Sequence, residues 1–432
     1  MQLVWHRGDL RTHDHPALHA ATSAGPCIGL VILDPRILDQ TSARRKAWFT
    51  ANVSALRSSY AKRGSVLLVR EGVPWEVLPQ LVRELGAHAV HAIKSYTPYG
   101  RWRDSSSTQA LTIPLHWHSG QYVQEPGSVR RDDGGNYTVY TPYSKRWWAV
   151  PMPIPLASPS QLHGTTLSLP HGEIPALESD VPLPSAGEDA AMNALDAFLK
   201  HKLAGYEKGR DRLDGSGSSG LSVYLNLGVL SPRVAAHRVR AAGGAGAQKW
   251  VAELAWRDFG ADLMWHRPEM LSAPFDARWN RLQWIEDRVG FEAWCEGRTG
   301  YPVIDAAMRE LKATGHMSNR CRMVVAQFLS KLLLLPWTWG ERVFKDWLLD
   351  GDTAQNVAGW QWASGLGVDA APYFRVFNPV SQGAEHDPGG VWIKHWVPES
   401  QGRPDALPGA IVDAGAARKR YLEVAGQIGR TK

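Results

Sequence analysis

The apolar positions in the first part of the chain follow two alternating patterns. Five short apolar runs, the kind that form strands buried in a sheet, are Leu3–Trp5, Cys27–Leu33, Val66–Val69, Ala89–Ile93 and Leu115–His118. Between these runs, Ser42–Arg63 and Trp75–Leu85 carry apolar residues at helical spacing. Strands that alternate with helices predict an α/β domain with a doubly wound parallel sheet.

From Asp189 onward the pattern becomes helical throughout, with short breaks and no alternating strand pattern. The predicted helices are Ala190–Lys202, Pro232–Ala241, Ala247–His266, Tyr301–Thr314, Asn319–Leu335 and Glu341–Leu349. The stretch between the two patterns is rich in Pro, Gly and Ser and reads as a connector. We therefore predict an α/β domain over 1–125, a connector over 126–187 and an all-helical domain over 188–432.

Composition narrows the class of protein. The chain has 432 residues, 44% hydrophobic and 21% charged, which is typical of a folded protein too long for one core. Cys27, Cys295 and Cys321 lie too far apart to suggest a disulfide scaffold or a zinc cluster. No apolar stretch is long enough to span a membrane, and the charged N-terminus lacks the core of a signal peptide. These features predict a cytoplasmic protein with no membrane partner.

Charge and aromatic content leave two interpretations open. The net charge of +6 permits a nucleic-acid partner without requiring one. The 20 tryptophans are explained by core packing, although some of them could stack on bases or pass electrons.

A glycine-rich segment has the spacing of a dinucleotide-binding loop. Gly215-Ser-Gly-Ser-Ser-Gly220 matches G-x-G-x-x-G, but the charged residues before it do not form the strand that this fingerprint requires. The Rossmann interpretation is therefore rejected. A flexible loop and a cradle for phosphate oxygens both remain open.

Polar residues also recur at helical spacing within apolar segments. Trp250, Glu253, Trp256 and Arg257 share one predicted helix face, and an ion pair on a half-exposed face would explain them without any function. A second predicted face carries Asn319, Arg322 and Met323. Asp350 and Asp352 flank a glycine, where a helix cap explains Asp352 and a metal site would need more ligands. We predict no metal.

Taken together, these segments resemble the photolyase/cryptochrome family, and within it most closely the class I cyclobutane pyrimidine dimer photolyases. The resemblance is carried by the Gly/Ser loop, Gly300–Met308, Asn319–Met323 and above all WQWASGLGVDAAPYFRVFNP over 360–379. It covers nearly the whole chain. It implies an α/β antenna domain, a connector and a helical flavin domain. It also implies that the protein acts on DNA as a monomer.

The resemblance implies non-covalent FAD, reduced in the active form. The residues that would hold it are Tyr206, Ser218, Ser219, Gly220, Leu221, Ser222, Trp250, Arg257, Asn319, Arg322, Asp350, Asp352 and Asn356. Arg322 and Asp350 are expected to form an ion pair beside the flavin ring. Asn356 would face the flavin N5, where a neutral amide suits reduced flavin better than a carboxylate.

The substrate implied is DNA containing a pyrimidine dimer, which is flipped out of the helix before repair. The matching lesion-pocket and DNA-contact positions are Arg210, Glu253, Trp256, Asn319, Arg320, Met323, Trp362 and Gln382. Glu253 would hydrogen-bond the dimer. Trp360, Trp337 and Trp284 match an electron-transfer chain, with Trp360 nearest the flavin and Trp284 outermost.

Several positions depart from the family pattern. His316 stands where a bulky apolar residue is common, and Gly220 where an arginine is common. The segment at Ser95 lacks the Asn-Glu pair of a folate antenna, so a flavin or deazaflavin is expected there. The antenna candidates are Arg45, Ser95, Thr97 and Gly100.

Two other functions remain as alternatives. A (6-4) photolyase resembles this chain but places histidines where Asn319 and Met323 stand. A cryptochrome sensor often carries a long C-terminal tail, and this chain stops soon after its last family segment. Both features favour dimer repair.

Overall fold

The computed structural model of the protein describes residues 1–164, 169–369 and 372–429, which form two compact units. The first unit comprises Met1–Gly135, Ser144–Ala204 and Ser219–Trp265. The second comprises Asn136–Tyr143, Gly205–Ser218 and His266–Lys432. Each is described separately below. The domain boundaries expected at residues 125 and 187 stay a prediction.

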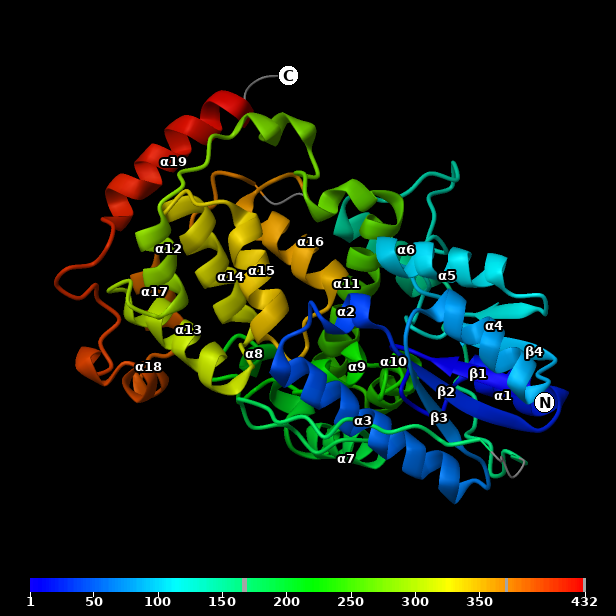
Figure 1. The fold of residues 1–432 in the computed structure, drawn as a ribbon. Coiled ribbons are helices and arrows are strands. Elements are labelled where there is room, and N and C mark those ends of the chain that lie inside the picture. Colours follow the sequence, from blue (N-terminus) through cyan, green and yellow to red (C-terminus); the bar gives the residue numbers. More distant parts are fainter. Residues whose placement is uncertain (165–168, 370–371, 430–432) are drawn as a thin grey trace. The chain divides into compact units, whose positions relative to one another are not determined.

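The first unit is built around a parallel sheet of five strands in the order β3-β2-β1-β4-β5 (Figure 1). The strands are β1 (Gln2–His6), β2 (Cys27–Leu33), β3 (Leu67–Glu71), β4 (Ala89–Ile93) and β5 (Leu115–His118). All five strands expected from the sequence are present, and the bounds of three match. The expectation of a parallel sheet is confirmed.

The two faces of this sheet bury different side chains. On one face Leu3 and Trp5 of β1 join the main apolar cluster together with Leu78 and Leu81 of α4 (Pro74–Leu85). The opposite face meets α1 (Pro16–Ala24) and α3 (Ala43–Lys62). There Gly29 of β2 is required, because a Cβ at this position would overlap the ring of Tyr60 from α3.

The first unit also contains further helices. They are α2 (Pro35–Leu38), α5 (Pro98–Ala110), α7 (Glu188–His201), α9 (Ser222–Asn226), α10 (Pro232–Ala242) and α11 (Gly244–His266), while α6 (Tyr140–Ala149) crosses into it from the second unit. The predicted helices over 190–202, 232–241 and 247–266 are therefore present. Helix α5 has little apolar periodicity and was not predicted.

Helices are the only regular secondary structure in the described residues of the second unit. Its α-helices are α8 (Tyr206–Gly209), α12 (Arg288–Cys295), α13 (Pro302–Thr314), α14 (Asn319–Gln327), α15 (Trp337–Trp347), α16 (Thr353–Ser364), α17 (Pro379–His386), α18 (Val391–Trp396) and α19 (Ala414–Gly429). Helix α16 packs against both α14 and α15, which lie beside it in Figure 1. The predicted combination of a parallel α/β region and a helical region is confirmed.

One predicted helix changes character before its expected end. The sequence predicts a continuous helix over 319–335, but α14 ends at Gln327 and continues as a π-helix, η4 (Phe328–Leu332). Lys331 lies in this wider turn, almost fully buried, and donates to the carbonyl oxygens of Tyr373 and Arg375 at 3.4 and 2.9 Å. Helical periodicity alone does not distinguish an α-helix from a π-helix, so this change could not be predicted.

None of the helices in the described residues is both long enough and apolar enough to cross a lipid bilayer.

Candidate functional site

Helix α11 carries four of the candidate side chains of the first unit. Trp250 is buried and packs on Phe198 of α7, with ring centroids 5.8 Å apart. Trp256 and Glu253 are only partly buried. Arg257 is nearly buried, donates to the carbonyl oxygen of Gln121 at 2.9 Å and lies 4.5 Å from the ring centroid of Tyr122. Arg257 therefore ties α11 to the segment after β5, a contact that the sequence analysis missed.

Directly after Arg257, buried carboxylates hold the same segment. Asp258 accepts hydrogen bonds from the Gln124 backbone N–H and the Trp147 indole, both at 2.8 Å. One turn on, Asp262 accepts from the Gly127 N–H at 2.6 Å. Burial raises the pKa of Asp258 to about 7 and that of Asp262 to about 6. Helix α11 thus fixes the start of the predicted connector through side chains on the helix.

The raised pKa of Asp258 predicts how stability depends on pH. The unfolded carboxyl titrates near pH ~3.9, so between pH 4 and pH 7 the unfolded chain releases a proton that the folded chain keeps. The proton that the folded chain keeps on Asp258 stabilises the folded state relative to alkaline pH. This contribution to the free energy of unfolding is complete below about pH 4 and is lost as the pH rises through about 7. Asp258→Asn cannot titrate, so its stability should change less with pH.

Between acidic and mildly alkaline pH, we expect the free energy of unfolding of the wild type to fall by on the order of 3 kcal/mol more than that of Asp258→Asn. Urea unfolding at pH 5 and pH 8 measures this difference. Asp189→Asn is the matched control, because Asp189 is exposed on the surface of α7. Parallel pH profiles for wild type and Asp258→Asn would contradict the prediction.

The Gly/Ser loop follows a short helix, α8, and not a strand, in agreement with the rejection of the Rossmann interpretation. Gly215 and Gly220 both have φ angles in the left-handed region, at 63° and 69°, which favours glycine. Asp214 accepts from the Ser216 N–H at 3.0 Å and pairs with Arg212 at 2.7 Å. The first half of the loop is therefore an ordered turn.

Helices α14 and α16 and the segment between them carry the candidates closest to chemistry in the second unit. Arg322 and Asp350 form the expected ion pair, with Nη2 2.9 Å and 3.0 Å from the two carboxylate oxygens. Arg322 also donates through Nε to the Met317 carbonyl oxygen at 2.9 Å. Asp350 is buried, so this guanidinium is held in one orientation by a carboxylate and a carbonyl.

Asn356 of α16 is held by a residue that the sequence analysis missed. Its side-chain nitrogen donates to the backbone oxygen of Glu341 at 2.9 Å and to Glu341 Oε1 at 2.8 Å. Because both donors of the amide point at Glu341, the amide oxygen is directed away from it. Burial raises the pKa of the Glu341 carboxyl. Asp352 caps α16 by accepting from the Gln355 N–H at 3.1 Å, as its position suggested.

The candidate DNA contacts of the second unit group around Asp211. Arg320 of α14 lies 3.1 Å from Asp211, and Arg210 lies 3.9 Å from it. The Arg210 guanidinium also lies 5.9 Å from the ring centroid of Tyr206. Arg210, a predicted DNA-contact residue, and Arg320, a predicted lesion-pocket residue, thus lie on either side of one carboxylate.

The lesion-pocket candidates on α14 share one face of the helix, as predicted. The Asn319 amide donates to the Met323 sulfur at 3.7 Å, one turn away. His316 precedes this helix, and a Cβ at Gly215 would lie 3.2 Å from its ring. On α16 and α17, Trp362 is partly buried, and the Gln382 side-chain oxygen is buried with no hydrogen-bond partner among the described residues.

The three tryptophans of the expected electron-transfer chain differ in exposure. Trp360 and Trp337 are each 2% exposed, whereas Trp284 is partly exposed. Trp360 packs against Phe344 and Trp294, with centroid separations of 5.0 and 6.1 Å. Its indole N–H is buried without a hydrogen-bond partner in the described part of the chain.

Gly340 of α15 provides the space for this indole, because a Cβ there would overlap its outer edge.

Three of the antenna candidates, Ser95, Thr97 and Gly100, follow the carboxyl end of β4. The Thr97 hydroxyl caps α5 by accepting from the Gly100 N–H at 3.2 Å, and a Cβ at Gly100 would overlap the Ser95 side chain. Ser95 N–H donates to Asp104 at 3.2 Å. Arg45, in the first turn of α3, is partly buried.

An aromatic group that was not predicted lies beyond the same end of the sheet. The Arg36 guanidinium lies 4.3 Å from the Trp75 ring centroid and 5.5 Å from that of Trp102. Tyr99 packs on Trp102 at 5.7 Å and donates to Asp34. These residues follow three different strands. Their separation along the chain hides the group, although the carboxyl edge of a parallel sheet is where ligands usually bind.

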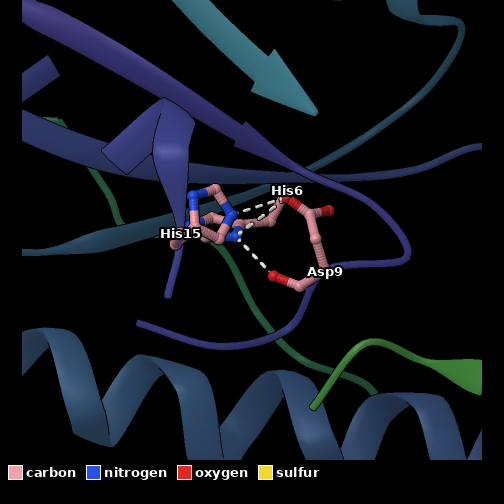
Figure 2. A group of neighbouring side chains, drawn as sticks. All are labelled: His6, Asp9 and His15. Atoms are coloured by element: carbon pink, nitrogen blue, oxygen red, sulfur yellow. Dashed lines mark hydrogen bonds and ion pairs between the residues drawn. The ribbon is translucent and has the colours of Figure 1, made fainter. Parts of the chain in front are cut away.

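Close to the end of β1, His6, Asp9 and His15 form a buried group that could hold a metal ion by proximity alone (Figure 2). The Leu18 N–H donates to His15 Nδ1 at 3.0 Å, so the ring proton sits on Nε2 and is donated to Asp9 at 2.7 Å. His6 is held likewise, by Tyr60 at 2.7 Å and the Asp9 carbonyl at 3.0 Å. The His15 nitrogen facing Asp9 has no free lone pair, so we interpret the group as structural.

Comparison with known proteins identifies two matching family models. Residues 2–160 match the model described as DNA photolyase, and residues 250–426 match the FAD binding domain of DNA photolyase. Over 430 residues the chain is 53% identical to the deoxyribodipyrimidine photo-lyase of Thermus thermophilus, covering 99% of both chains.

Solved structures agree over the full length. A class III photolyase from Agrobacterium tumefaciens is 32% identical with a TM-score of 0.92, covering 100% of this chain and 98% of that one. A cryptochrome from Synechocystis is 28% identical with a TM-score of 0.91 (98% and 99% covered). A Sulfolobus tokodaii photolyase with two FAD molecules is 28% identical with a TM-score of 0.86 (99% and 100% covered).

Proposed function

The chain belongs to the photolyase/cryptochrome family, and we propose that it is a light-driven enzyme that splits cyclobutane pyrimidine dimers in DNA. The observation that carries the proposal is the 53% identity, over 99% of both chains, to a deoxyribodipyrimidine photo-lyase. The match to the FAD binding domain of DNA photolyase over residues 250–426 supports FAD as the cofactor. When bound in its reduced form and excited by light, FAD supplies the electron that opens the cyclobutane ring and takes it back afterwards.

The side chains of the second unit fit this cofactor. The Asn356 amide directs its two donors to Glu341, which leaves its oxygen as an acceptor for an N–H such as flavin N5–H. The Arg322–Asp350 pair supplies a fixed guanidinium suited to a polar ring edge. With Tyr206, Ser218, Asn319 and Asp352, these residues are proposed to bind FAD.

The first unit contributes a different kind of surface. Ser219, Gly220, Leu221 and Ser222 present hydroxyl and backbone donors suited to phosphate oxygens, and the Gly220 position is open around its Cα. Trp250 offers an apolar face, and Arg257 holds the helix in place through Gln121. These residues are likewise proposed to bind FAD, Arg257 through its positioning of α11.

Substrate binding is proposed to extrude the dimer from the duplex, since light-driven repair needs it close to the flavin. Arg210 and Gln382 would contact the DNA. The residues that would contact the flipped dimer are Arg320, Asn319, Met323 and Trp362 of the second unit and Trp256 of the first. Indole faces stack on the fused pyrimidines, and Glu253 hydrogen-bonds their polar edge. Affinity should fall with salt, because phosphate contacts release counterions.

Membership of class I is a finer proposal. It is supported by the resemblance of the segments over 300–308, 319–323 and 360–379 to class I members, while Asn319 and Met323, which stand where a (6-4) photolyase has histidines, favour dimer repair over (6-4) repair. A second chromophore of flavin or deazaflavin type is also proposed, at the carboxyl edge of the sheet near Arg45, Ser95, Thr97 and Gly100. The two FAD molecules of the Sulfolobus tokodaii photolyase support a flavin in this role. We further propose that the protein works as a cytoplasmic monomer.

Repair under light tests the proposed function. The purified chain with reduced FAD is mixed with an oligonucleotide carrying one thymine dimer, and the remaining dimer is measured after blue light or darkness. We expect loss of the dimer only in the light. Equal dimer content in both samples would reject the proposal and favour a sensor role. Repair of a (6-4) photoproduct and not of the dimer would favour the other repair class.

Glu253→Gln should lower the repair yield per photon by about fivefold while flavin absorption stays unchanged, since one hydrogen bond is worth roughly 1 kcal/mol. The amide keeps the size of the side chain but exchanges an acceptor oxygen for a donor. Glu207→Gln, on the exposed part of α8, is the control. An unchanged yield in Glu253→Gln would leave Glu253 with only a structural role on α11.

A further inference from the structure

Three histidines lie on one face of the sheet at its edge. His91 belongs to β4, and His116 and His118 belong to the edge strand β5. The register sets His91 opposite His116 and Ile93 opposite His118. Because successive side chains of a strand point to opposite faces, His116 and His118 share a face, and it is the face on which His91 lies. An H-x-H pair with a third histidine on the next strand brings three imidazoles together.

Two of the three rings, those of His91 and His118, approach the spacing that a metal ion needs, and the exposed ring of His116 would turn to bring a nitrogen to the same point. His91 Nδ1 lies 3.2 Å from His118 Nε2. Their ring planes differ by 21° with centroids 5.4 Å apart, so the rings face each other by their edges. The His116 centroid is 5.0 Å from that of His91. Zinc–nitrogen bonds of about 2.0–2.1 Å in tetrahedral geometry separate two ligand atoms by about 3.3–3.4 Å.

A hydrogen bond to Gln2 fixes which nitrogen of His91 carries the proton. Its Nε2 lies 3.2 Å from Gln2 Oε1, an acceptor, so Nε2 carries the proton and Nδ1 has the lone pair. Such a partner on the far nitrogen is typical of metal-binding histidines. The Nδ1 lone pair of His91 accepts the hydrogen bond from His118 Nε2–H at 3.2 Å, and a metal ion between the two rings would replace that proton.

We propose that His91, His116 and His118 bind a divalent transition-metal ion. Imidazole nitrogens select Zn²⁺, Cu²⁺ or Ni²⁺ over Mg²⁺ and Ca²⁺, which prefer oxygen. His116 is exposed and His118 partly exposed, so the ion has direct access from solvent, and water would complete its coordination. This site is independent of the proposed repair function.

Calorimetric titration with Zn²⁺ tests the proposal. The full chain with FAD is stripped with a chelator and titrated at pH 7.5 in excess Mg²⁺, which occupies phosphate groups. We expect one equivalent of Zn²⁺ to bind. His118→Gln and His116→Gln should each weaken binding by at least about tenfold, and Gln2→Leu by about tenfold through the orientation of His91. His116 is exposed, so its replacement should not disturb folding.

His88→Gln is the matched control, because His88 lies 3.4 Å from the N-terminal amine and offers a competing surface site. Its titration should match that of the wild type. Circular dichroism of each variant verifies that the fold is retained. The proposal is overturned by no saturable Zn²⁺ binding to the wild type, or by binding that His116→Gln and His118→Gln leave unchanged.

Discussion

Trp360→Phe should abolish photoreduction of oxidised flavin, yet leave dimer repair intact once the flavin has been reduced chemically. Phenylalanine loses an electron far less readily than tryptophan, so it would break the proposed chain at the step nearest the flavin. Folding should survive, because the indole N–H has no hydrogen-bond partner among the described residues and its loss costs nothing. The smaller ring leaves a cavity, which should lower the free energy of unfolding by about 1–2 kcal/mol.

Trp294→Phe is the matched control for this experiment. Trp294 is fully buried and its centroid lies 6.1 Å from that of Trp360, but it is outside the proposed chain. Its indole donates to the Val325 carbonyl oxygen at 3.1 Å, so this variant should lose more stability and still photoreduce. Anaerobic absorption spectra under illumination measure flavin photoreduction in both variants. Normal photoreduction in Trp360→Phe would reduce Trp360 to a packing role.

Asn356→Asp should lower the reduction potential of the bound flavin by about 60 mV or more, which is tenfold in a one-electron equilibrium. The variant loses both amide donors and sets a second carboxylate beside Glu341 Oε1, now 2.8 Å from the amide nitrogen. A negative charge there opposes the addition of an electron. Spectroelectrochemical titration of the purified protein measures the potential.

Glu341→Gln/Asn356→Asp separates two causes of that shift. With glutamine at 341, the new aspartate receives a hydrogen bond and does not meet a carboxylate, so the effect of charge near the flavin remains without repulsion inside the protein. The double variant should keep a lowered potential and regain stability relative to Asn356→Asp. A potential equal to that of wild type in both variants would remove Asn356 from the flavin site.

The five strands and their parallel direction could be predicted because the strands are short, mostly apolar and separated by helices. Cys27–Leu33 is buried along its whole length, so its apolar run and its structural bounds coincide. Helix α5 escaped prediction because its buried positions include Arg103 and Asp104, which bond to each other. Periodicity detects apolar burial and not burial through ion pairs.

The candidate site was less accessible to pattern analysis. The ion pair of Arg322 with Asp350 was expected only from the family resemblance, since the two residues lie 28 positions apart. Glu341 was missed altogether, because its bond to Asn356 depends on how α15 packs against α16. The helix face on which Arg257 lies could be predicted from its spacing. Its hydrogen bond to the Gln121 carbonyl oxygen could not, because that contact depends on the tertiary structure.

The close approach of Gly340 to the Trp360 indole links the evolution of these two positions. While tryptophan stands at 360, any side chain at 340 overlaps its outer ring, so Gly340→Ala should be strongly destabilising by itself. In a Trp360→Phe background the outer ring is gone, and the same change becomes tolerable. The two substitutions are therefore epistatic. A lineage that accepted alanine at 340 after losing the indole could not regain it by a single mutation.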